Sequence, residues 1–272
     1  KLNIPVVNYF PPTAWIWGEW RARWMAKNNI TIASAFPLEK KIYEKAGADV
    51  SFVGHPLLDI VQVEESSLEI YDKLELNSEK RVVGLLPGSR NSEIESLLPK
   101  MLDAAEKLQQ DFPDLQFVLP LAPDVDQKKI SAKVGEHNVI LKIVDNYTYQ
   151  TMKIADLVIT ASGTATLESL IMKTPMIVLY ETSWSTYQLG KRLMNVEYIG
   201  LPNIIAGKEV VPELIQEQVS GENIFEEAVY LLKREYVLQN MGKKLESLKD
   251  KLGGPGAVEK TARLVLNEGG LI

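Results

Sequence analysis

The sequence contains no cysteine and only two histidines, His55 and His137. The absence of cysteine excludes disulfide scaffolds, thiolate metal sites and cysteine nucleophiles. Two histidines are too few for a histidine-rich metal centre. We expect neither a metal ion nor a cofactor. No apolar run reaches the length of about 18 residues that a membrane-spanning helix needs, and no signal-peptide pattern opens the chain.

An excess of positive charge is also missing, because 30 basic residues stand against 36 acidic ones, for a net charge of −6 at pH 7. This balance is not typical of a protein that wraps nucleic acid, so we expect no nucleic-acid partner. It still permits a local basic site for phosphate. The 272 residues, of which 46% are hydrophobic and 24% charged, are those of a globular chain with one large or two smaller domains.

Short β-branched runs alternate with longer amphipathic stretches. The predicted strands are Ile4–Tyr9, Ile30–Ala33, Val50–Val53, Val82–Leu86, Gln116–Leu119, Val139–Leu141, Leu157–Thr160 and Met176–Leu179. The predicted helices are Arg21–Lys27, Leu38–Ala46, Glu93–Gln110, Gln127–Val134, Thr148–Ile154, Thr164–Ile171 and Trp184–Leu193. Most of the strands are apolar on both faces, as in a parallel sheet that helices cover on both sides. The alternation therefore predicts a doubly wound α/β fold.

The domain organisation follows from where the alternation breaks. Residues 59–80 form an acidic, polar and weakly helical stretch, and we expect a linker there. Residues 1–58 hold too few strands for a complete domain, whereas residues 81–252 supply enough for a Rossmann-like one. From Pro212 onward we expect almost only helices. The Gly/Pro break before the last helix lets residues 253–272 pack back on the first domain.

The first candidate phosphate loop runs from Leu85 to Arg90 and follows a predicted strand. Gly88 lets the backbone approach a ligand closely, Ser89 offers a hydroxyl, and Arg90 offers a planar guanidinium that fits phosphate oxygens. Ligands of open α/β sheets bind beyond the carboxyl ends of the strands, where this loop lies. The alternative is a tight turn whose arginine is merely solvated.

The second candidate loop follows the predicted strand Leu157–Thr160 and opens a helix. Its small residues expose free N–H groups at the helix N-terminus, where the macrodipole favours anions. These residues are Ser162, Gly163, Thr164, Ala165 and Thr166. The hydroxyls of Ser162, Thr164 and Thr166 add donors, and Ser162 or Thr164 is the expected N-cap.

The Glu168 carboxylate, one turn into this helix, could accept both hydroxyls of a ribose. The alternative is an ordinary capped helix start in which Glu168 complements the dipole. The loop matches neither a P-loop nor a Gly-x-Gly-x-x-Gly pattern, which disfavours ATP and dinucleotides. Two such loops after strands of one sheet predict a phosphate-containing ligand.

Three further features carry weaker signals. The segment from Gly200 to Gly207 is expected to be an apolar loop, in which Asn203 could contact a ligand but is by default a turn residue. His55 lies in a Gly-His-Pro sequence at the end of a predicted strand, where a lone histidine is more often structural than catalytic. His137, in a polar loop, carries no signal.

Four tryptophans crowd into the ten residues from position 15 to position 24. Trp15, Trp17, Trp20 and Trp24 interleave there with Arg21 and Arg23, and Lys27 follows. Such a patch suits a membrane–water interface or a pocket for acyl chains. Three of the tryptophans also share one face of a helix, which would bury them against the sheet. The sequence leaves both explanations open.

Several segments, in order along nearly the whole chain, resemble one known family. They are Phe52–Leu57, Leu85–Glu95, Ala161–Glu168, Thr174–Met176, Tyr187, Leu201–Asn203 and Pro212–Glu217. Together they are similar to the lipid-A-disaccharide synthases, glycosyltransferases of the GT-B type. The resemblance implies a GT-B-like fold, with a Rossmann-like donor-binding domain, the remaining part of a second Rossmann-like domain and a helical C-terminus.

The resemblance also implies an activity, namely transfer of 2,3-diacylglucosamine from its UDP derivative to 2,3-diacylglucosamine 1-phosphate with release of UDP. By position, Gly88, Ser89 and Arg90 would face the diphosphate, the helix start from Ser162 to Thr166 would hold phosphate, and Glu168 would hold the ribose. Arg90 and Asn203 match positions tied to the family's activity. The uracil would lie against backbone near Val144–Tyr147.

Both substrates of the family carry acyl chains, which implies a cytoplasmic protein that is peripheral at the inner face of the cytoplasmic membrane; a homodimer stays open. Family members carry a further segment before the position matching Lys1, with a glycine-rich acceptor-side loop and the general base. We therefore expect the 272-residue chain alone to be almost inactive. Two alternatives remain, another GT-B UDP-sugar enzyme (a UDP-N-acetylglucosamine transferase or 2-epimerase) and a nucleotide-sugar-binding module without catalysis.

Overall fold

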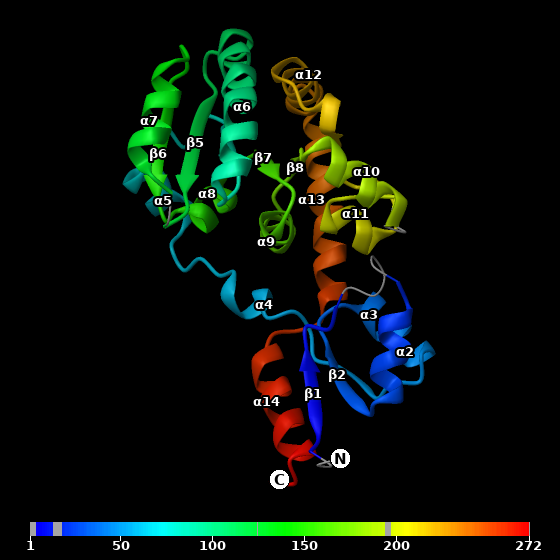
Figure 1. Ribbon diagram of the computed structural model, residues 1–272. Helices are drawn as coiled ribbons and strands as arrows, with labels where there is room; N and C mark the ends of the chain where they lie inside the picture. The colour runs from blue at the N-terminus through cyan, green and yellow to red at the C-terminus, as the bar shows by residue number, and fades with distance from the viewer. Residues whose placement is uncertain (1–3, 13–17, 124, 194–196, 272) are drawn as a thin grey trace. The chain divides into compact units, whose positions relative to one another are not determined.

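The computed structural model describes residues 4–12, 18–123, 125–193 and 197–271, which form two compact units (Figure 1). The first unit contains Lys1–Gln62, Ser183–Glu197 and Ser247–Ile272. The second unit contains Val63–Thr182 and Tyr198–Glu246. Each unit therefore combines segments that lie far apart in the sequence.

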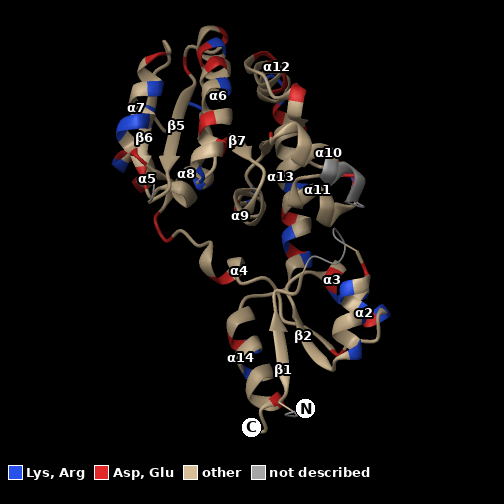
Figure 2. Cartoon of the chain, in the orientation of Figure 1, with Lys and Arg blue, Asp and Glu red and all other residues tan. Residues whose placement is uncertain are grey.

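A six-stranded parallel sheet forms the centre of the second unit. Its strands are β4 (Val82–Leu86), β5 (Gln116–Leu121), β6 (Leu141–Asp145), β7 (Leu157–Ala161), β8 (Met176–Tyr180) and β9 (Glu213–Ile215). They lie in the order β6-β5-β4-β7-β8-β9, and each neighbouring pair is parallel. Every residue of β4 and β7 is buried, and neither strand contains a charged residue; β7 is drawn in tan in Figure 2. The chain reverses its direction of winding between β4 and β7, which makes a topological switch point there.

Helices cover this sheet and follow from amphipathic spacing in the sequence. They are α5 (Ser67–Lys73), α6 (Asn91–Asp111), α7 (Gln127–Gly135), α8 (Thr148–Ile154), α9 (Thr164–Met172), α11 (Leu201–Ala206) and α12 (Gly221–Leu232). The long helix α13 (Glu235–Lys249) begins in this unit. In α6 the buried Leu97, Leu98, Met101 and Leu108 recur at helical spacing and point one face of the helix into the core.

The first unit is smaller and is built on three parallel strands in the order β1-β2-β3. These are β1 (Val6–Tyr9), β2 (Ile30–Ser34) and β3 (Val50–Phe52), with helices α2 (Trp20–Lys27), α3 (Pro37–Lys45), α4 (Leu57–Ile60), α10 (Trp184–Leu193) and α14 (Ala257–Glu268). The terminal helix α14 packs along β1 (Figure 1). The Asp59 carboxylate accepts the backbone N–H groups of Gly256 at 2.6 Å and Ala257 at 3.1 Å, and so caps this helix.

The α/β fold class is confirmed, and all eight predicted strands are present. One is displaced, since the strand expected at Val139–Leu141 occupies Leu141–Asp145. From Pro212 onward the regular elements are almost all helices, as expected; the exception is β9, which pairs with β8 at the sheet edge. The expected loop over 200–207 is wrong, because Leu201–Ala206 form α11, in which Pro202 and Asn203 are buried.

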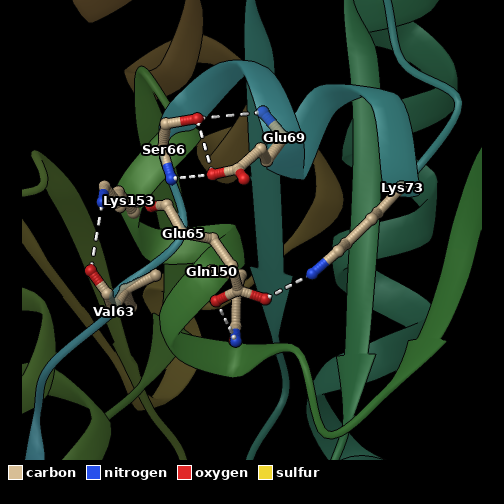
Figure 3. Close-up of polar contacts among 7 residues, drawn as sticks. All are labelled: Val63, Glu65, Ser66, Glu69, Lys73, Gln150 and Lys153. Atoms are coloured by element: carbon tan, nitrogen blue, oxygen red, sulfur yellow. Dashed lines mark hydrogen bonds and ion pairs between the residues drawn. The ribbon is translucent and has the colours of Figure 1, made fainter.

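The expected linker over 59–80 is too long, because the chain passes into the second unit at Val63. In the segment that follows, Ser66 and Glu69 cap α5 reciprocally, and Ile70 is completely buried in the core (Figure 3). Two polar contacts tie the segment to α8: Gln150 donates to Glu65 at 3.1 Å, and the Lys153 ammonium donates to the Val63 carbonyl at 3.2 Å. The acidic composition therefore hides a helix that packs on the second unit.

Candidate functional site

A cavity of about 330 Å³ lies at the carboxyl ends of β4 and β7. Its walls come from the loops after β4, β5 and β7 and from the first turns of α6, α8 and α9. The lining residues are Leu86, Gly88, Ser89, Arg90, Glu93, Pro120, Ala122, Thr148, Ala161, Ser162, Gly163, Thr164, Ala165 and Glu168. The switch point between β4 and β7 leaves this crevice open, because the connections of the two strands run to opposite sides of the sheet. The tertiary structure thus brings the two predicted phosphate loops together.

The loop after β4 depends on glycine at position 88. Gly88 has φ +104°, a conformation that side chains disfavour, and a Cβ at this position would lie 2.4 Å from Oε2 of Glu93. The Arg90 guanidinium donates from Nη1 to Oε1 of Glu93 at 2.7 Å, and its side chain is 79% exposed. An exposed ion pair of this kind contributes little free energy. Arg90 can therefore exchange Glu93 for an anionic ligand at small cost.

The start of α9 presents backbone donors to the cavity. Its N-cap is Gly163, not Ser162 or Thr164, and no side chain caps it. The N–H groups of a first helical turn have no acceptors within the helix, and Thr164 and Ala165 both line the cavity. These groups and the helix dipole together favour an anion there.

Thr166 does not line the cavity, contrary to the expectation of a phosphate-binding hydroxyl. Its side chain is completely buried, and Oγ1 donates to the Gly163 carbonyl at 2.7 Å. The hydroxyl therefore stabilises the first turn of α9 and leaves the backbone to face the cavity.

Asn203 is also absent from the cavity lining, although a ligand contact is expected from the sequence. Its amide is completely buried on α11, where Nδ2 donates to Val211 O at 2.8 Å and to Glu213 Oε1 at 2.7 Å. Its Oδ1 accepts the N–H groups of Val210 at 2.6 Å and Val211 at 3.0 Å. All of these partners lie within the fold, because α11 turns the amide inward.

A chain of hydrogen bonds runs from Asn203 to the cavity. The Glu213 carboxylate that Asn203 contacts also accepts the N–H groups of Ile199 and Gly200, each at 2.9 Å. The Ile199 carbonyl in turn lies 3.5 Å from Oγ of Ser162, which lines the cavity. Asn203 is thus placed to position Ser162 without touching a ligand.

Glu168 lines the cavity and has a partner that sequence reasoning missed. Its Oε1 accepts the hydroxyl of Tyr149 on α8 at 2.9 Å. Burial raises the pKa of Glu168, and the hydrogen bond from Tyr149 opposes that rise. Burial, followed by the charge of Glu168, raises the pKa of Tyr149 to about 12, so this tyrosine stays a donor at neutral pH. No local motif marks the pair, since the two residues meet only through the packing of α8 against α9.

The remaining sequence candidates lie elsewhere. Residues Val144–Tyr147 end β6 and precede α8; none of the four lines the cavity, but the next residue, Thr148, does. His55 is buried in the first unit, where its Nδ1 accepts the Leu57 N–H at 3.2 Å. Burial lowers the pKa of His55 to about 4, so the ring is neutral at neutral pH, in keeping with a structural role.

Two properties of the described residues bear on the classes of protein considered above. None of the described helices combines the length and the apolar character that a membrane crossing requires. Within the described ranges, no three His, Cys, Asp or Glu side chains gather closely enough to hold a metal ion.

Comparison with protein families gives one match over nearly the whole chain, to the family described as lipid-A-disaccharide synthetase, at residues 1–264. The lipid-A-disaccharide synthase of Geobacter sulfurreducens is 39% identical over 264 residues, which are 97% of this chain and 69% of that protein. That of Syntrophus aciditrophicus is 39% identical over 267 residues, covering 98% of this chain and 70% of that protein.

Solved structures share the fold at low sequence identity. The S. aureus MnaA–UDP complex has a TM-score of 0.60 at 15% identity, covering 89% of this chain and 60% of that chain. WaaG, a glycosyltransferase involved in lipopolysaccharide biosynthesis, has a TM-score of 0.54 at 14% identity, covering 87% and 62%. The likeness to both supports the GT-B-like architecture.

Proposed function

Because this chain belongs to the lipid-A-disaccharide synthetase family, we propose that its cavity between β4 and β7 binds the UDP part of an acylated sugar nucleotide. The family's enzymes are hexosyltransferases. In the proposed reaction, 2,3-diacylglucosamine passes from its UDP derivative to a hydroxyl of 2,3-diacylglucosamine 1-phosphate. The acceptor hydroxyl gives its proton to a general base as its oxygen forms a bond to the anomeric carbon, the bond from that carbon to the diphosphate breaks, and UDP leaves.

One observation carries the proposal, namely that two anion-binding loops face each other across one cavity at the switch point of the sheet. Gly88, Ser89 and Arg90 supply a hydroxyl and a guanidinium from one side. Gly163 to Ala165 supply the free N–H groups of a helix start from the other side. Ser162 lines the cavity beside them with its hydroxyl, because its own N–H donates to the Leu179 carbonyl at 2.7 Å. Both sets of donors stabilise charge that grows on the diphosphate as the sugar departs.

The other residues take roles around this centre. Glu168 accepts the ribose hydroxyls, and the uracil lies against the backbone near Val144–Tyr147. Asn203 does not contact the ligand. It acts as a positioning residue for Ser162, through Glu213 and the backbone of residues 199–200. This indirect role accounts for a buried asparagine at a position that the family resemblance ties to activity.

A second candidate is a UDP-N-acetylglucosamine 2-epimerase. It is favoured by the UDP-GlcNAc 2-epimerase of Neisseria meningitidis bound to UDP-GlcNAc, which has a TM-score of 0.58 at 14% identity and covers 96% of this chain and 76% of that chain. An epimerase acts on the unacylated sugar nucleotide. Binding of the acylated but not the unacylated UDP-sugar would favour the transferase.

We expect the 272-residue chain to bind UDP in the presence of EDTA. The donors around the cavity are a guanidinium, hydroxyls and backbone N–H groups, all of which bind phosphate without a bridging cation. Isothermal titration calorimetry with UDP, with and without magnesium, measures this directly. UDP binding that appears only on addition of magnesium would contradict the prediction, and uridine alone serves as the control for the diphosphate.

We also propose that α2 contacts the inner face of the cytoplasmic membrane, where acylated substrates reside. Trp20 is 63% and Trp24 55% exposed, while Ala22 and Met25 of the same helix are buried, so the two tryptophans are not core residues. Trp15 and Trp17 lie outside the described residues. Arg21 lies over the Trp20 ring at 5.4 Å, and basic residues are visible on α2 in Figure 2. Exposed tryptophans beside cations suit an anionic membrane interface.

Trp20→Ser and Trp24→Ser should each reduce co-sedimentation with anionic liposomes and leave the melting temperature unchanged. Each cation near such a surface adds about 1 kcal/mol, so attachment is reversible and sensitive to the loss of one anchor. Tyr236→Ser is the matched control, because Tyr236 is 70% exposed in the second unit. A lower melting temperature with unchanged sedimentation would contradict the membrane proposal.

A further inference from the structure

The pair formed by Tyr149 and Glu168 is arranged asymmetrically around the cavity. Glu168 lines the cavity, whereas Tyr149 is not among its lining residues. The tyrosine hydroxyl donates to Oε1 of Glu168 at 2.9 Å. An ionised carboxylate has two oxygens and about four acceptor positions, so this single bond leaves acceptors for a ligand.

Within the described part of the chain, no charged side chain contributes to the shifted pKa of Glu168. The first turn of α6 brings Arg90 and Glu93 to the cavity, but they pair with each other at 2.7 Å. Helix α11, which packs against α9, has the sequence Leu-Pro-Asn-Ile-Ile-Ala and no titratable side chain. From α8 the titratable group that reaches Glu168 is Tyr149, and burial and this tyrosine account for the altered pKa of Glu168.

Tyr149 is itself held in place by the anchoring of α8. The neighbouring Gln150 donates to Glu65 at 3.1 Å, and Lys153 donates to the backbone carbonyls of Val63 and Glu65 (Figure 3). On the other side of α8, the Thr174 hydroxyl donates to the Met152 carbonyl at 2.7 Å. A short helix fixed on both sides directs the tyrosine hydroxyl with little freedom.

We infer that Tyr149 is a positioning residue that holds the Glu168 carboxylate ready to accept the two ribose hydroxyls, so that this site selects ribonucleoside over deoxyribonucleoside diphosphates. The inference rests on the proposed function, because it takes UDP as the ligand. Tyr149 thereby determines specificity without touching the ligand. A diol that donates both hydroxyls binds an ionised carboxylate more strongly than a neutral acceptor, because hydrogen bonds to a charged group are stronger.

The pH dependence of this selection follows from the partners of Glu168. An ionised Glu168 accepts both hydroxyls, so the preference for the diol is present at high pH and is lost as the pH falls through the raised pKa of this carboxyl. Removing the Tyr149 hydroxyl removes the hydrogen bond that lowers the pKa of Glu168. The pKa of Glu168 then rises further, and the preference is lost at a higher pH.

The test measures the dissociation constants of UDP and 2′,3′-dideoxy-UDP by calorimetry across a pH series, with melting temperatures recorded for each protein. The proteins are the parent chain, Tyr149→Phe, Glu168→Gln and Tyr71→Phe. Tyr71 is the matched control, because its partly buried hydroxyl also reaches α8, donating to the Ile154 carbonyl at 3.3 Å, but does not line the cavity.

We expect Tyr149→Phe to lower the ratio of the dissociation constant of 2′,3′-dideoxy-UDP to that of UDP about 3- to 10-fold at neutral pH. The same variant should move the midpoint of the pH dependence of this ratio upward. Glu168→Gln should abolish the pH dependence, and Tyr71→Phe should change neither quantity. If Tyr149→Phe keeps the parental ratio and midpoint, or weakens both nucleotides equally, the inference is overturned while the proposed function stands. A parent chain that binds UDP without preferring it to the dideoxy form also overturns the inference alone. A parent chain that does not bind UDP overturns both.

Discussion

Asn203→Ala should lower the free energy of unfolding by about 3–5 kcal/mol, the largest loss of stability expected from a single polar side chain here. The substitution removes four hydrogen bonds from a completely buried amide. It strands the N–H groups of Val210 and Val211, of which Val211 is completely buried. Each buried group left without a partner costs about 1–3 kcal/mol. Urea denaturation followed by circular dichroism measures the change.

Asn223→Ala is the matched control for this substitution. The Asn223 side chain donates one hydrogen bond, to the Gln218 carbonyl at 2.9 Å, in a more exposed part of the same unit. Its replacement should cost about 1 kcal/mol. A loss for Asn203→Ala no larger than that for Asn223→Ala would show that the Asn203 network stabilises the second unit no more than one exposed hydrogen bond does. It would also remove the reason for treating Asn203 as a positioning residue.

Arg90→Ala should weaken UDP binding by about 1.5–3 kcal/mol, the range for a hydrogen bond to a charged group, which corresponds to a roughly 10- to 150-fold rise in the dissociation constant. Two effects act together. The guanidinium that would bind the diphosphate is lost, and Glu93, its present partner at 2.7 Å, is left as an unneutralised carboxylate beside the cavity. Calorimetric titration with UDP measures the change.

The double variant Arg90→Ala/Glu93→Gln separates these two effects. Removing the Glu93 charge should recover part of the lost affinity, and Arg90→Lys should fall between parent and alanine because lysine keeps the charge but not the planar fork. Arg263→Ala is the control, since Arg263 forms a similar exposed pair with Glu259 at 2.9 Å on α14. Arg90→Ala binding UDP as tightly as the Arg263 control would place the diphosphate elsewhere.

Local patterns were enough to predict the parallel sheets and to single out the two candidate phosphate loops. Strands such as β4 and β7 are almost entirely apolar. Glycine and hydroxyl residues follow both strands closely along the chain, and an arginine follows β4. Both signals are local, because burial on two faces and the composition of a strand-to-helix turn are written in consecutive residues. The same patterns placed Gly88, Ser89, Arg90 and Glu168 in candidate loops.

Features that depend on distant partners escaped this reasoning. The three residues of β9 become a strand because β8 offers a free edge, and α5 becomes part of the core because Ile70 meets β-strand residues far along the chain. The hydroxyl of Thr166 suggests a phosphate-binding residue. Asn203 is tied to activity by the family resemblance, whereas its type alone indicates a turn residue. The fold turns both inward, where their polar atoms satisfy backbone groups.

The sequence by itself determined the fold class, the family and the residue types that can bind a diphosphate, because each is encoded in short stretches with a fixed period or composition. Only the tertiary structure decided which of those residues share one cavity. The strand order brings the loops after β4 and β7 together across 71 positions from Arg90 to Ala161. The packing of α8 on α9 likewise gives Glu168 its tyrosine partner. Such contacts depend on how helices and strands pack in three dimensions, and no local run of residues records them.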